Sequence, residues 1–307
     1  MKKSKLLKVF LMVLCAGVGL FSLTACPRAP KEKDILVIAR SSGSGTRDAF
    51  DGLIKNVAGD SLAKTAGGAA QPSGIFVESI VQLDSTGAVI TKVASAATAI
   101  GYVSLGSVDG TVKAVSVNGV APSAETVLDG GYALKRPFVI ITNKSVSLTA
   151  AAADFMRYLN SSDAQLVVED GYVRQDGDGK TAYMLPESNL SGRVYLRGST
   201  SVEPLMDDLI ADYIRICGSK AAGVEFNLDT VNSSAGIADA KADNVGNVIG
   251  MSSSALKEAD GAALNHFDIA LDAVAVVVNN GNGISNLTVA QIFDIYTGAI
   301  KKFSQLR

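Results

Sequence analysis

Apolar residues along this chain fall into two alternating patterns, one typical of strands and one typical of helices. Residues 35–39 form a short β-rich apolar run, and Phe50, Leu53, Ile54 and Val57 then recur at positions i, i+3, i+4 and i+7. The second spacing places these side chains on one face of a helix, whereas a short apolar run is typical of a buried strand. The pattern therefore predicts a strand followed by a helix that packs one face on a core.

The same alternation continues to the end of the chain. Further strands are expected at residues 99–103, 112–117, 137–142, 194–196, 248–250 and 273–278. Further helices are expected at residues 85–96, at 149–169, around Pro204, and at 288–296. Because strands that alternate with helices are typical of α/β folds, we expect a protein of that class.

A loop of serine, glycine and threonine joins the first strand to the first helix. It reads R-S-S-G-S-G-T from Arg40 to Thr46. The first N–H groups of a helix lack intrahelical partners and the helix dipole is positive there, so such a loop is a place where anions bind. Glycine lets the backbone approach a ligand closely. The loop therefore predicts an anion site made of N–H groups, hydroxyls and one guanidinium.

Three later loops have the same character. They read G-S-T-S at residues 198–201, N-S-S-A-G at 232–236 and M-S-S-S at 251–254, and each follows an apolar strand. Each hydroxyl has an alternative role as the N-cap of its own helix, and for one loop taken alone capping is the better interpretation. Four such loops in one chain favour the other interpretation, in which they converge on one anion.

Length and composition are those of a folded globular protein. The 307 residues are enough for two domains or lobes. A content of 48% hydrophobic and 19% charged residues separates the chain from disordered ones. The formal net charge is only −2, and binding to a nucleic-acid backbone normally needs a concentrated basic face. We therefore do not expect a nucleic-acid-binding protein.

No combination of residues in the sequence indicates catalysis. His266 is the only histidine and has no serine or cysteine motif nearby, so a catalytic triad is not supported. The R-S-S-G-S-G-T loop lacks the G-K-[ST] ending of a nucleotide-binding P-loop, and no histidine or cysteine spacing fits a metal site. Cys217 is expected to be a small buried side chain. We expect no enzyme, no metal and no cofactor.

The N-terminus has the pattern of a secretory signal. Four lysines precede an apolar run at residues 9–23, which is shorter than the ~20 residues of a membrane span. The run ends in L-T-A-C, which resembles a bacterial lipoprotein signal. Residues 1–25 are then expected to be removed, Cys26 to carry the lipid, and residues 26–33 to form a tether. The mature chain would be extracytoplasmic and lipid-anchored to the cell membrane.

Several motifs together resemble the phosphate-binding proteins that deliver phosphate to ABC importers. They are V-I-A-R-S-S-G-S-G-T-R-D-A-F at residues 37–50, G-Y-V-S-L-G at 101–106, V-A-P-S-A-E-T-V at 120–127, G-S-T-S-V-E-P-L at 198–205, and I-S-N-L-T with I-Y-T-G within 284–298. The resemblance covers nearly all of residues 34–307. It implies a non-catalytic receptor with a two-lobe, type II periplasmic-binding-protein-like α/β fold that clamps inorganic phosphate. It also implies a monomer that docks on the permease subunits of an ABC transporter.

The order of these motifs departs from the resembling family. There the segment like G-S-T-S-V-E-P-L comes first, whereas here the G-S-G-T-R half is first. This order predicts a circularly permuted chain, with the old termini joined through a linker at about residues 173–193. Permutation is tolerated at exposed loops when the termini lie close together; the rival explanation is a fragment of a tandem or misassembled gene. One lobe would combine residues 34–115 with 275–307, and the other would be 116–274.

The resemblance also assigns the anion contacts. They are Arg40, Ser44, Gly45 and Thr46 from one lobe, and Thr200, Ser201, Ser233 and Ser253 from the other. Arg40 would make the charged contact. Arg47 has an alternative role as a salt-bridge partner of Asp48 or Asp51.

Two positions bear on which anion is bound. Members of the family often place an acidic residue at the position of Ser42 or near Ser253, where it affects the discrimination of protonated phosphate from sulfate. Both are serine here, and a hydroxyl both donates and accepts hydrogen bonds. Phosphate stays the expected ligand, with sulfate or molybdate as alternatives. The alternative from another class is a surface adhesion or scaffold protein that kept the fold without the ligand.

Overall fold

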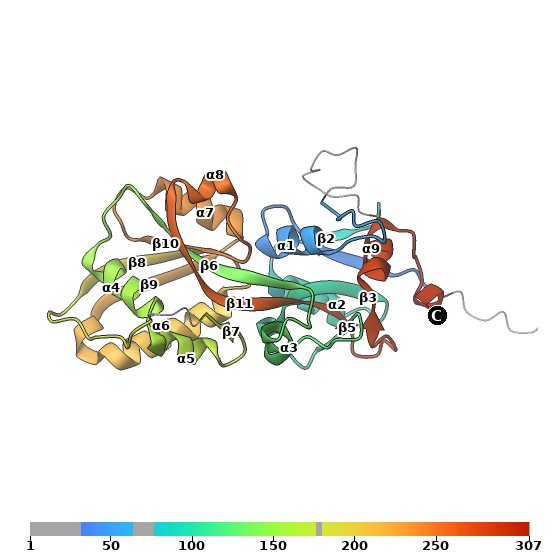
Figure 1. Cartoon of the computed structure of the whole chain (residues 1–307), viewed down its shortest axis with the longest axis horizontal. Helices are drawn as coiled ribbons and strands as arrows, with labels where there is room; N and C mark the ends of the chain where they lie inside the picture. Colours follow the sequence, from blue (N-terminus) through green and yellow to red (C-terminus); the bar gives the residue numbers. More distant parts are fainter. Residues whose placement is uncertain (1–31, 64–76, 176–179, 307) are drawn as a thin grey trace, which may run out of the picture. The chain divides into compact units, whose positions relative to one another are not determined.

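One long strand joins the two halves of the main sheet. The computed structural model describes residues 32–63, 77–175 and 180–306. Strand β11 (Leu264–Asn279) pairs its first half with β6 (Lys135–Asn143) and its second half with β3 (Ala99–Ser104) and β4 (Val112–Ala114), in each case antiparallel. Figure 1 shows β6 and β11 running side by side from one group of elements to the other.

Parallel strands lie on both sides of this antiparallel centre. On one side β1 (Leu36–Arg40) lies between β2 (Val81–Leu83) and β3. On the other side β8 (Ser191–Gly198) lies between β10 (Val248–Ser252) and β9 (Gly223–Thr230), and β10 pairs antiparallel with β6. The sheet order is therefore β2-β1-β3-β11-β6-β10-β8-β9, with β4 and β7 (Val173–Arg174) paired to β11. A separate pair is formed by β5 (Ser116–Val117) and β12 (Asn286–Leu287).

Helices connect these strands and cover the sheet. They are α1 (Gly45–Leu53), α2 (Thr86–Ala94), α3 (Ala124–Leu128), α4 (Ala150–Leu159), α5 (Ser162–Val168), α6 (Glu203–Cys217), α7 (Ser233–Ala242), α8 (Glu258–Gly261) and α9 (Val289–Thr297). Short 3₁₀ turns occupy Leu105–Ser107, Gly218–Ala221 and Phe303–Leu306. The structure confirms the α/β class, since helices follow most strands of the parallel sets.

Apolar side chains collect in two large cores within the compact unit Lys33–Arg307. One core draws on residues 35–134 and 273–296, together with Val173. The other draws on residues 138–270. We call the part of the chain around the first core the GSGT lobe and the part around the second the GSTS lobe, after the loops they carry. Both lobes belong to one unit because β6 and β11 pass through both.

The chain crosses between the lobes later than the expected boundary at residue 116. Val117, Val127, Tyr132 and Leu134 are all buried in the core of the GSGT lobe. The reason is local pairing, because β5 is held by β12, and the hydroxyl of Tyr132 donates to the carbonyl of Val274 at 3.0 Å. Residues up to 134 therefore stay with the GSGT lobe, and β6 makes the crossing.

The segment expected to be a linker, residues 173–193, is packed against the GSTS lobe where it is described. The hydroxyl of Tyr183 donates to Asp154 and contacts the sulfur of Cys217 at 3.3 Å, and its backbone N–H donates to Asp163. The last residues of the range already belong to β8. The expected signal at residues 1–25 and the expected lipidation site Cys26 lie outside the described residues. Within the described residues, no helix is both long and apolar enough to cross a membrane.

Candidate functional site

The loop after β1 brings polar groups to the start of α1. Gly43 has φ +85°, a left-handed conformation that glycine adopts without strain, and it turns the chain into the helix. The hydroxyl of Ser44 accepts a hydrogen bond from the N–H of Arg47 at 3.4 Å and so caps α1. Ser44 therefore follows the capping interpretation of the sequence.

Helices α2, α6 and α7 are not capped by the hydroxyls assigned to the anion. Ser85 caps α2 and Asn232 caps α7. Helix α6 begins after Val202, which makes no side-chain cap, and has Pro204 in its first turn. Hydroxyls near these helix starts are therefore available for other partners. They belong to Thr86, Ser199, Thr200, Ser201 and Ser233.

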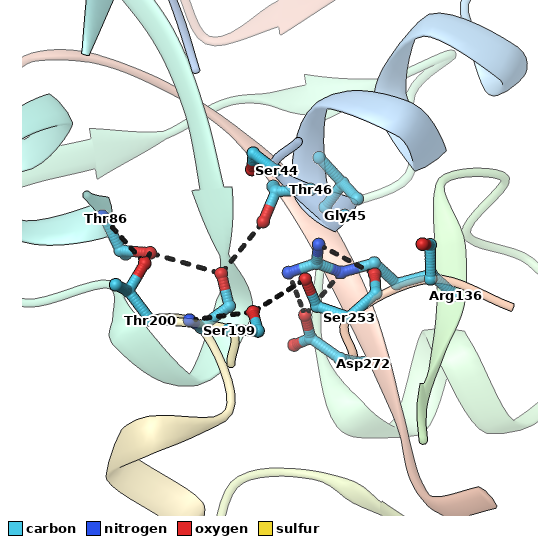
Figure 2. A network of polar contacts seen from close by, with 12 residues as sticks. Ser44, Gly45, Thr46, Thr86, Arg136, Ser199, Thr200, Ser253 and Asp272 are labelled. Atoms are coloured by element: carbon cyan, nitrogen blue, oxygen red, sulfur yellow. Dashed lines mark hydrogen bonds and ion pairs between the residues drawn. The ribbon is translucent and has the colours of Figure 1, made fainter. Parts of the chain in front are cut away.

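These hydroxyls meet across the two lobes (Figure 2). Thr46 Oγ1 lies 2.8 Å from Ser201 Oγ, and the N–H of Gly45 donates to Ser233 Oγ at 3.2 Å. Thr86 Oγ1 lies 3.2 Å from Thr200 Oγ1 and 3.1 Å from Ser201 Oγ. All of these side chains are buried. The loops at the carboxyl ends of the parallel strands thus form one buried polar cluster, as expected for ligand sites of open α/β sheets.

The loop after β10 completes the cluster. Ser199 Oγ donates to Ser253 Oγ at 2.8 Å, and the N–H of Ser253 donates to Ser233 Oγ at 3.1 Å. A Cβ on Gly45 would lie 2.4 Å from Ser233 Oγ and 2.9 Å from Ser253 Oγ. Only glycine therefore allows α1 to approach the opposite loops this closely. We call Thr46, Thr86, Ser199, Thr200, Ser201, Ser233 and Ser253, with the N–H of Gly45, the hydroxyl cluster.

Arg40 lies at the edge of this cluster. Its guanidinium donates to the carbonyls of Leu83 at 3.3 Å and Asp84 at 2.6 Å and to Thr86 Oγ1 at 3.2 Å. The side chain is buried, and burial lowers the pKa of Arg40 to about 10. The guanidinium therefore stays charged at neutral pH and reaches the hydroxyl cluster through Thr86.

Arg47 has a structural role in the same loop. Its guanidinium contacts Asp51 at 3.3 Å, Gln82 at 2.9 Å and the carbonyl of Arg40 at 3.1 Å. These contacts join α1 to the end of β1 and to β2. Of the two carboxylates proposed as its partner, the structure pairs Arg47 with Asp51.

Arg136 at the start of β6 also borders the cluster. Its Nη1 donates to the carbonyl of Ser253 at 3.1 Å, and its Nε and Nη2 donate to Asp272 at 3.0 and 2.9 Å. A cavity of 380 Å³ lies beside this point, with Ala49, Leu53 and Ile237 among its lining residues. Arg136 therefore lies between the polar cluster and a cavity bounded by helices of both lobes.

The structure brings seven of the eight predicted contacts into the cluster or its edge, and uses the hydroxyl of the eighth, Ser44, as a helix cap. Three further residues, Thr86, Ser199 and Arg136, were not predicted. Thr86 had a signal, since Ser85 and Thr86 follow a strand and start a helix as in the other loops. Arg136 had none, because it directly precedes the strand expected at residues 137–142 and its place beside the cluster is set by tertiary structure.

The cluster provides hydrogen-bond donors and positive charge for an anion. Hydroxyls donate or accept, backbone N–H groups at helix starts only donate, and the guanidinium groups are permanent cations. Within the described ranges no group of three or more histidine, cysteine or acidic side chains is placed to hold a metal ion. A tetrahedral oxyanion fits such a set of donors.

Comparisons with known proteins agree on one family. The profile of the PBP superfamily domain matches residues 23–163 and 186–306. The chain is 36% identical over 312 residues to phosphate-binding protein PstS 2 of Streptococcus pneumoniae, covering 96% of this chain and 98% of that protein. It is 32% identical over 316 residues to phosphate-binding protein PstS 2 of Streptococcus agalactiae, covering 100% and 99%.

One solved structure is similar to most of this chain. It is a phosphate-binding protein of a phosphate ABC transporter from Streptococcus pneumoniae, which matches with a TM-score of 0.62 and 36% identity over 89% of this chain and 100% of that chain. The two-lobed α/β fold with its polar cluster between the lobes defines a ligand-binding protein of the periplasmic type. The matches are more specific: the chain belongs to the PBP superfamily, in the family of the phosphate-binding proteins.

Proposed function

We propose that this protein is a receptor that captures inorganic phosphate between its two lobes and delivers it to an ABC importer. The observation that carries the proposal is the hydroxyl cluster, in which groups from five strand-to-helix loops of both lobes converge. Relatives that match over nearly their full length are named phosphate-binding proteins, which supports the same ligand.

Binding requires the two lobes to separate and close again. Hydroxyls of opposite lobes contact each other directly, as Thr46 and Ser201 do. An entering phosphate would replace these hydroxyl contacts with bonds to its own oxygens. A hydrogen bond to a charged group contributes about 1.5 to 3 kcal/mol, so a handful of such bonds offset the several kcal/mol of desolvating the anion. The balance is compatible with the ~8 kcal/mol of micromolar affinity.

The resemblance also supports a place and partners for this receptor. The similar solved protein is described as part of a phosphate ABC transporter. By analogy the closed, phosphate-loaded receptor docks as a monomer on the permease subunits of an importer and performs no catalysis itself. The N-terminal pattern supports secretion and a lipid anchor at Cys26.

Titration calorimetry with phosphate, sulfate and molybdate tests the proposal. We expect phosphate to bind, and Arg40→Ala to remove most of the affinity because the charged group at the cluster is lost. Arg193→Ala is the matched control, since Arg193 is an exposed arginine of the GSTS lobe that pairs with Glu225. Absence of binding by all three anions contradicts the proposed function, and normal binding by Arg40→Ala contradicts the role of Arg40.

Sulfate is the informative competitor in that titration. Ser42 is exposed, and Ser253 belongs to the cluster and presents a hydroxyl instead of a carboxylate. A carboxylate only accepts hydrogen bonds and repels a fully deprotonated anion, whereas a hydroxyl accepts from a protonated anion or donates to a deprotonated one. We therefore expect measurable sulfate binding, weaker than phosphate binding.

A further inference from the structure

A buried ion pair connects the strands that cross between the lobes. Arg136 of β6 and Asp272 of β11 are direct partners in the β6–β11 register. Both side chains are 1% exposed, and two guanidinium nitrogens, Nε and Nη2, share the same carboxylate oxygen. The carboxylate therefore fixes the plane and the direction of the guanidinium.

The rest of the guanidinium faces the hydroxyl cluster. A guanidinium has five N–H donors, and Arg136 uses three of them, two on Asp272 and one on the carbonyl of Ser253. The other two, one on each terminal nitrogen, have no acceptor among the described residues. Figure 2 shows the guanidinium above Asp272, pointing toward Ser253 and Ser199. Two oriented donors of a cation thus remain beside the cluster.

Stability of the fold is a weak reason for such a pair. Removing two charges from water costs several kcal/mol per ion, and well-packed apolar side chains often replace a buried ion pair without loss of stability. A guanidinium held in a fixed plane is, in contrast, well suited to a planar pair of oxygens on a phosphate. The pair lies at the lobe crossing, and Arg136 contacts the loop of Ser253, a member of the hydroxyl cluster.

We propose that Arg136 is a second anion-binding arginine of this site, with Asp272 as the residue that positions it. The inference rests on the proposed function and adds a contact to it. Arg136 then binds phosphate oxygens through its two remaining N–H donors, while Arg40 approaches from the side of Thr86. Asp272 accepts from Nε and Nη2 and so leaves the other N–H groups of the guanidinium for the ligand.

A site with two arginines prefers the more highly charged form of its ligand. Each added cation gains more from a dianion than from a monoanion, because the Coulomb energy scales with the ligand charge. The affinity for total phosphate is therefore expected to rise between pH 6 and pH 8, as phosphate changes from the monoanion to the dianion. If Arg136 had a purely structural role, replacing it would leave the pH dependence of phosphate affinity unchanged.

The test replaces the ion pair by apolar residues of similar size. We expect the double variant Arg136→Met with Asp272→Leu to fold. It should bind phosphate about 10- to 100-fold more weakly than the unchanged chain, because one charge-assisted contact is lost. Its affinity should also rise less between pH 6 and pH 8. The matched control is Arg193→Gln with Glu225→Gln, which removes an exposed arginine–carboxylate pair of the GSTS lobe.

The outcomes separate this inference from the proposed function. If the unchanged chain binds no oxyanion, the proposed function fails. If it binds phosphate and the Arg136/Asp272 double variant binds equally well with the same pH slope, only the role of Arg136 fails. Should the double variant not fold, Arg136→Lys keeps the charge and loses the planar fork. It is then expected to bind about 10-fold more weakly, and unchanged affinity would overturn the inference.

Discussion

At the scale of single residues, Gly45 sets how closely the two lobes approach. The space where its Cβ would stand is taken by Ser233 Oγ, 2.4 Å away, and by Ser253 Oγ, 2.9 Å away. Both oxygens are buried members of the hydroxyl cluster. The absence of a side chain at this residue is therefore part of the site.

Gly45→Ala is expected to reduce phosphate affinity by about 10-fold or more, because a shift of about 1 Å misplaces donors that must act together. Calorimetry measures the affinity and thermal unfolding measures the stability. Gly52→Ala is the matched control in the same helix, since nothing lies within 4 Å of its added Cβ. That control should keep the affinity and gain about 0.5 to 1 kcal/mol of stability; equal affinity in both variants would contradict the close-approach argument.

Asp51 is a buried carboxyl group whose pKa responds to its surroundings. Burial raises the pKa of Asp51 from its ordinary value of 3.8 to about 7, and outweighs the opposing effect of Arg47. One carboxylate oxygen of Asp51, Oδ1, has no partner among the described residues. The folded chain therefore retains a proton on Asp51 at pH values where the unfolded chain has released it.

We predict that this proton makes a pH-dependent contribution to stability. Between about pH 4 and pH 7 the native state binds more protons than the unfolded state, so the contribution of Asp51 to the free energy of unfolding falls as pH rises. Asp51→Asn should remove this fall in the free energy of unfolding. The variant should therefore become more stable relative to the unchanged chain as pH rises to about 7, and the difference should stay constant above that pH. Urea unfolding at several pH values measures it, with the exposed Asp34→Asn as control. A pH-independent difference between Asp51→Asn and the unchanged chain would show that Asp51 does not titrate in this way.

At the scale of elements, α1 combines a cap with a ligand loop. Ser44 caps the helix, and the next two residues, Gly45 and Thr46, contact Ser233 and Ser201 of the other lobe. The cap and the site are therefore only one residue apart. A change at Ser44 can keep the cap and still alter the charge at the site.

Ser44→Asp separates these two roles. Aspartate is as good an N-cap as serine, so the stability of α1 should change little. The added negative charge beside the cluster should weaken phosphate binding by about 10-fold or more, through repulsion of like charges. Thr288→Asp makes the same kind of change at the cap of α9, away from the cluster, and should bind phosphate normally. Normal binding by Ser44→Asp would place the ligand elsewhere.

Element boundaries were predicted with uneven success. The apolar spacing extended the first helix to Val57, but α1 ends at Leu53 and Val57 is 96% exposed. Ile54 is buried although it is extended, because the chain there turns back so that Lys55 bridges to Ser61. Only the last part of β11 was predicted, since its first half carries polar residues on the more exposed face. The extent of β11 depends on partner strands that are distant in sequence, whereas the turn after Ile54 is local but is not recorded by apolar spacing.

At the scale of the whole molecule, the site forms where the two lobes close on each other. Gly43 of the GSGT lobe accepts a backbone hydrogen bond from Ser234 of the GSTS lobe at 3.1 Å. An added Cβ on Gly43 would lie 3.4 Å from the Cβ of Ser234. This separation is close to the distance of about 3.5 to 4.5 Å between the two Cβ atoms of a disulfide.

The double variant Gly43→Cys with Ser234→Cys is therefore expected to form a disulfide that holds the lobes closed. A cysteine in a left-handed conformation costs roughly 1 to 2 kcal/mol, which is tolerable in a fold of this size. When it is oxidised after loading with radioactive phosphate, the variant should release its ligand at least about 10-fold more slowly than after reduction. The two single variants are the controls. Equal release from the oxidised and reduced forms would contradict a closure that traps the ligand.

The order of the two halves is also a property of the whole chain. The alignment with the pneumococcal protein runs along 96% of this chain and 98% of that one, so both present their halves in the same order. Circular permutation relative to other phosphate-binding proteins stays a prediction. In either order the loops of the site lie far apart in sequence, as Thr46 and Ser201 do here, so the site forms only through contacts between distant segments.

The sequence by itself determined the α/β class, the four polar loops and the family. These depend on local patterns: apolar periodicity, Ser/Thr/Gly runs after strands, and motifs of several consecutive residues. Tertiary structure decided which hydroxyls of these loops face the opposite lobe. It also brought Thr86 and Arg136 to the cluster, fixed the crossing at β6, and required glycine at residue 45. The physical reason is that each of these depends on the distance between groups far apart in the chain, which packing and strand register set and local pattern does not record.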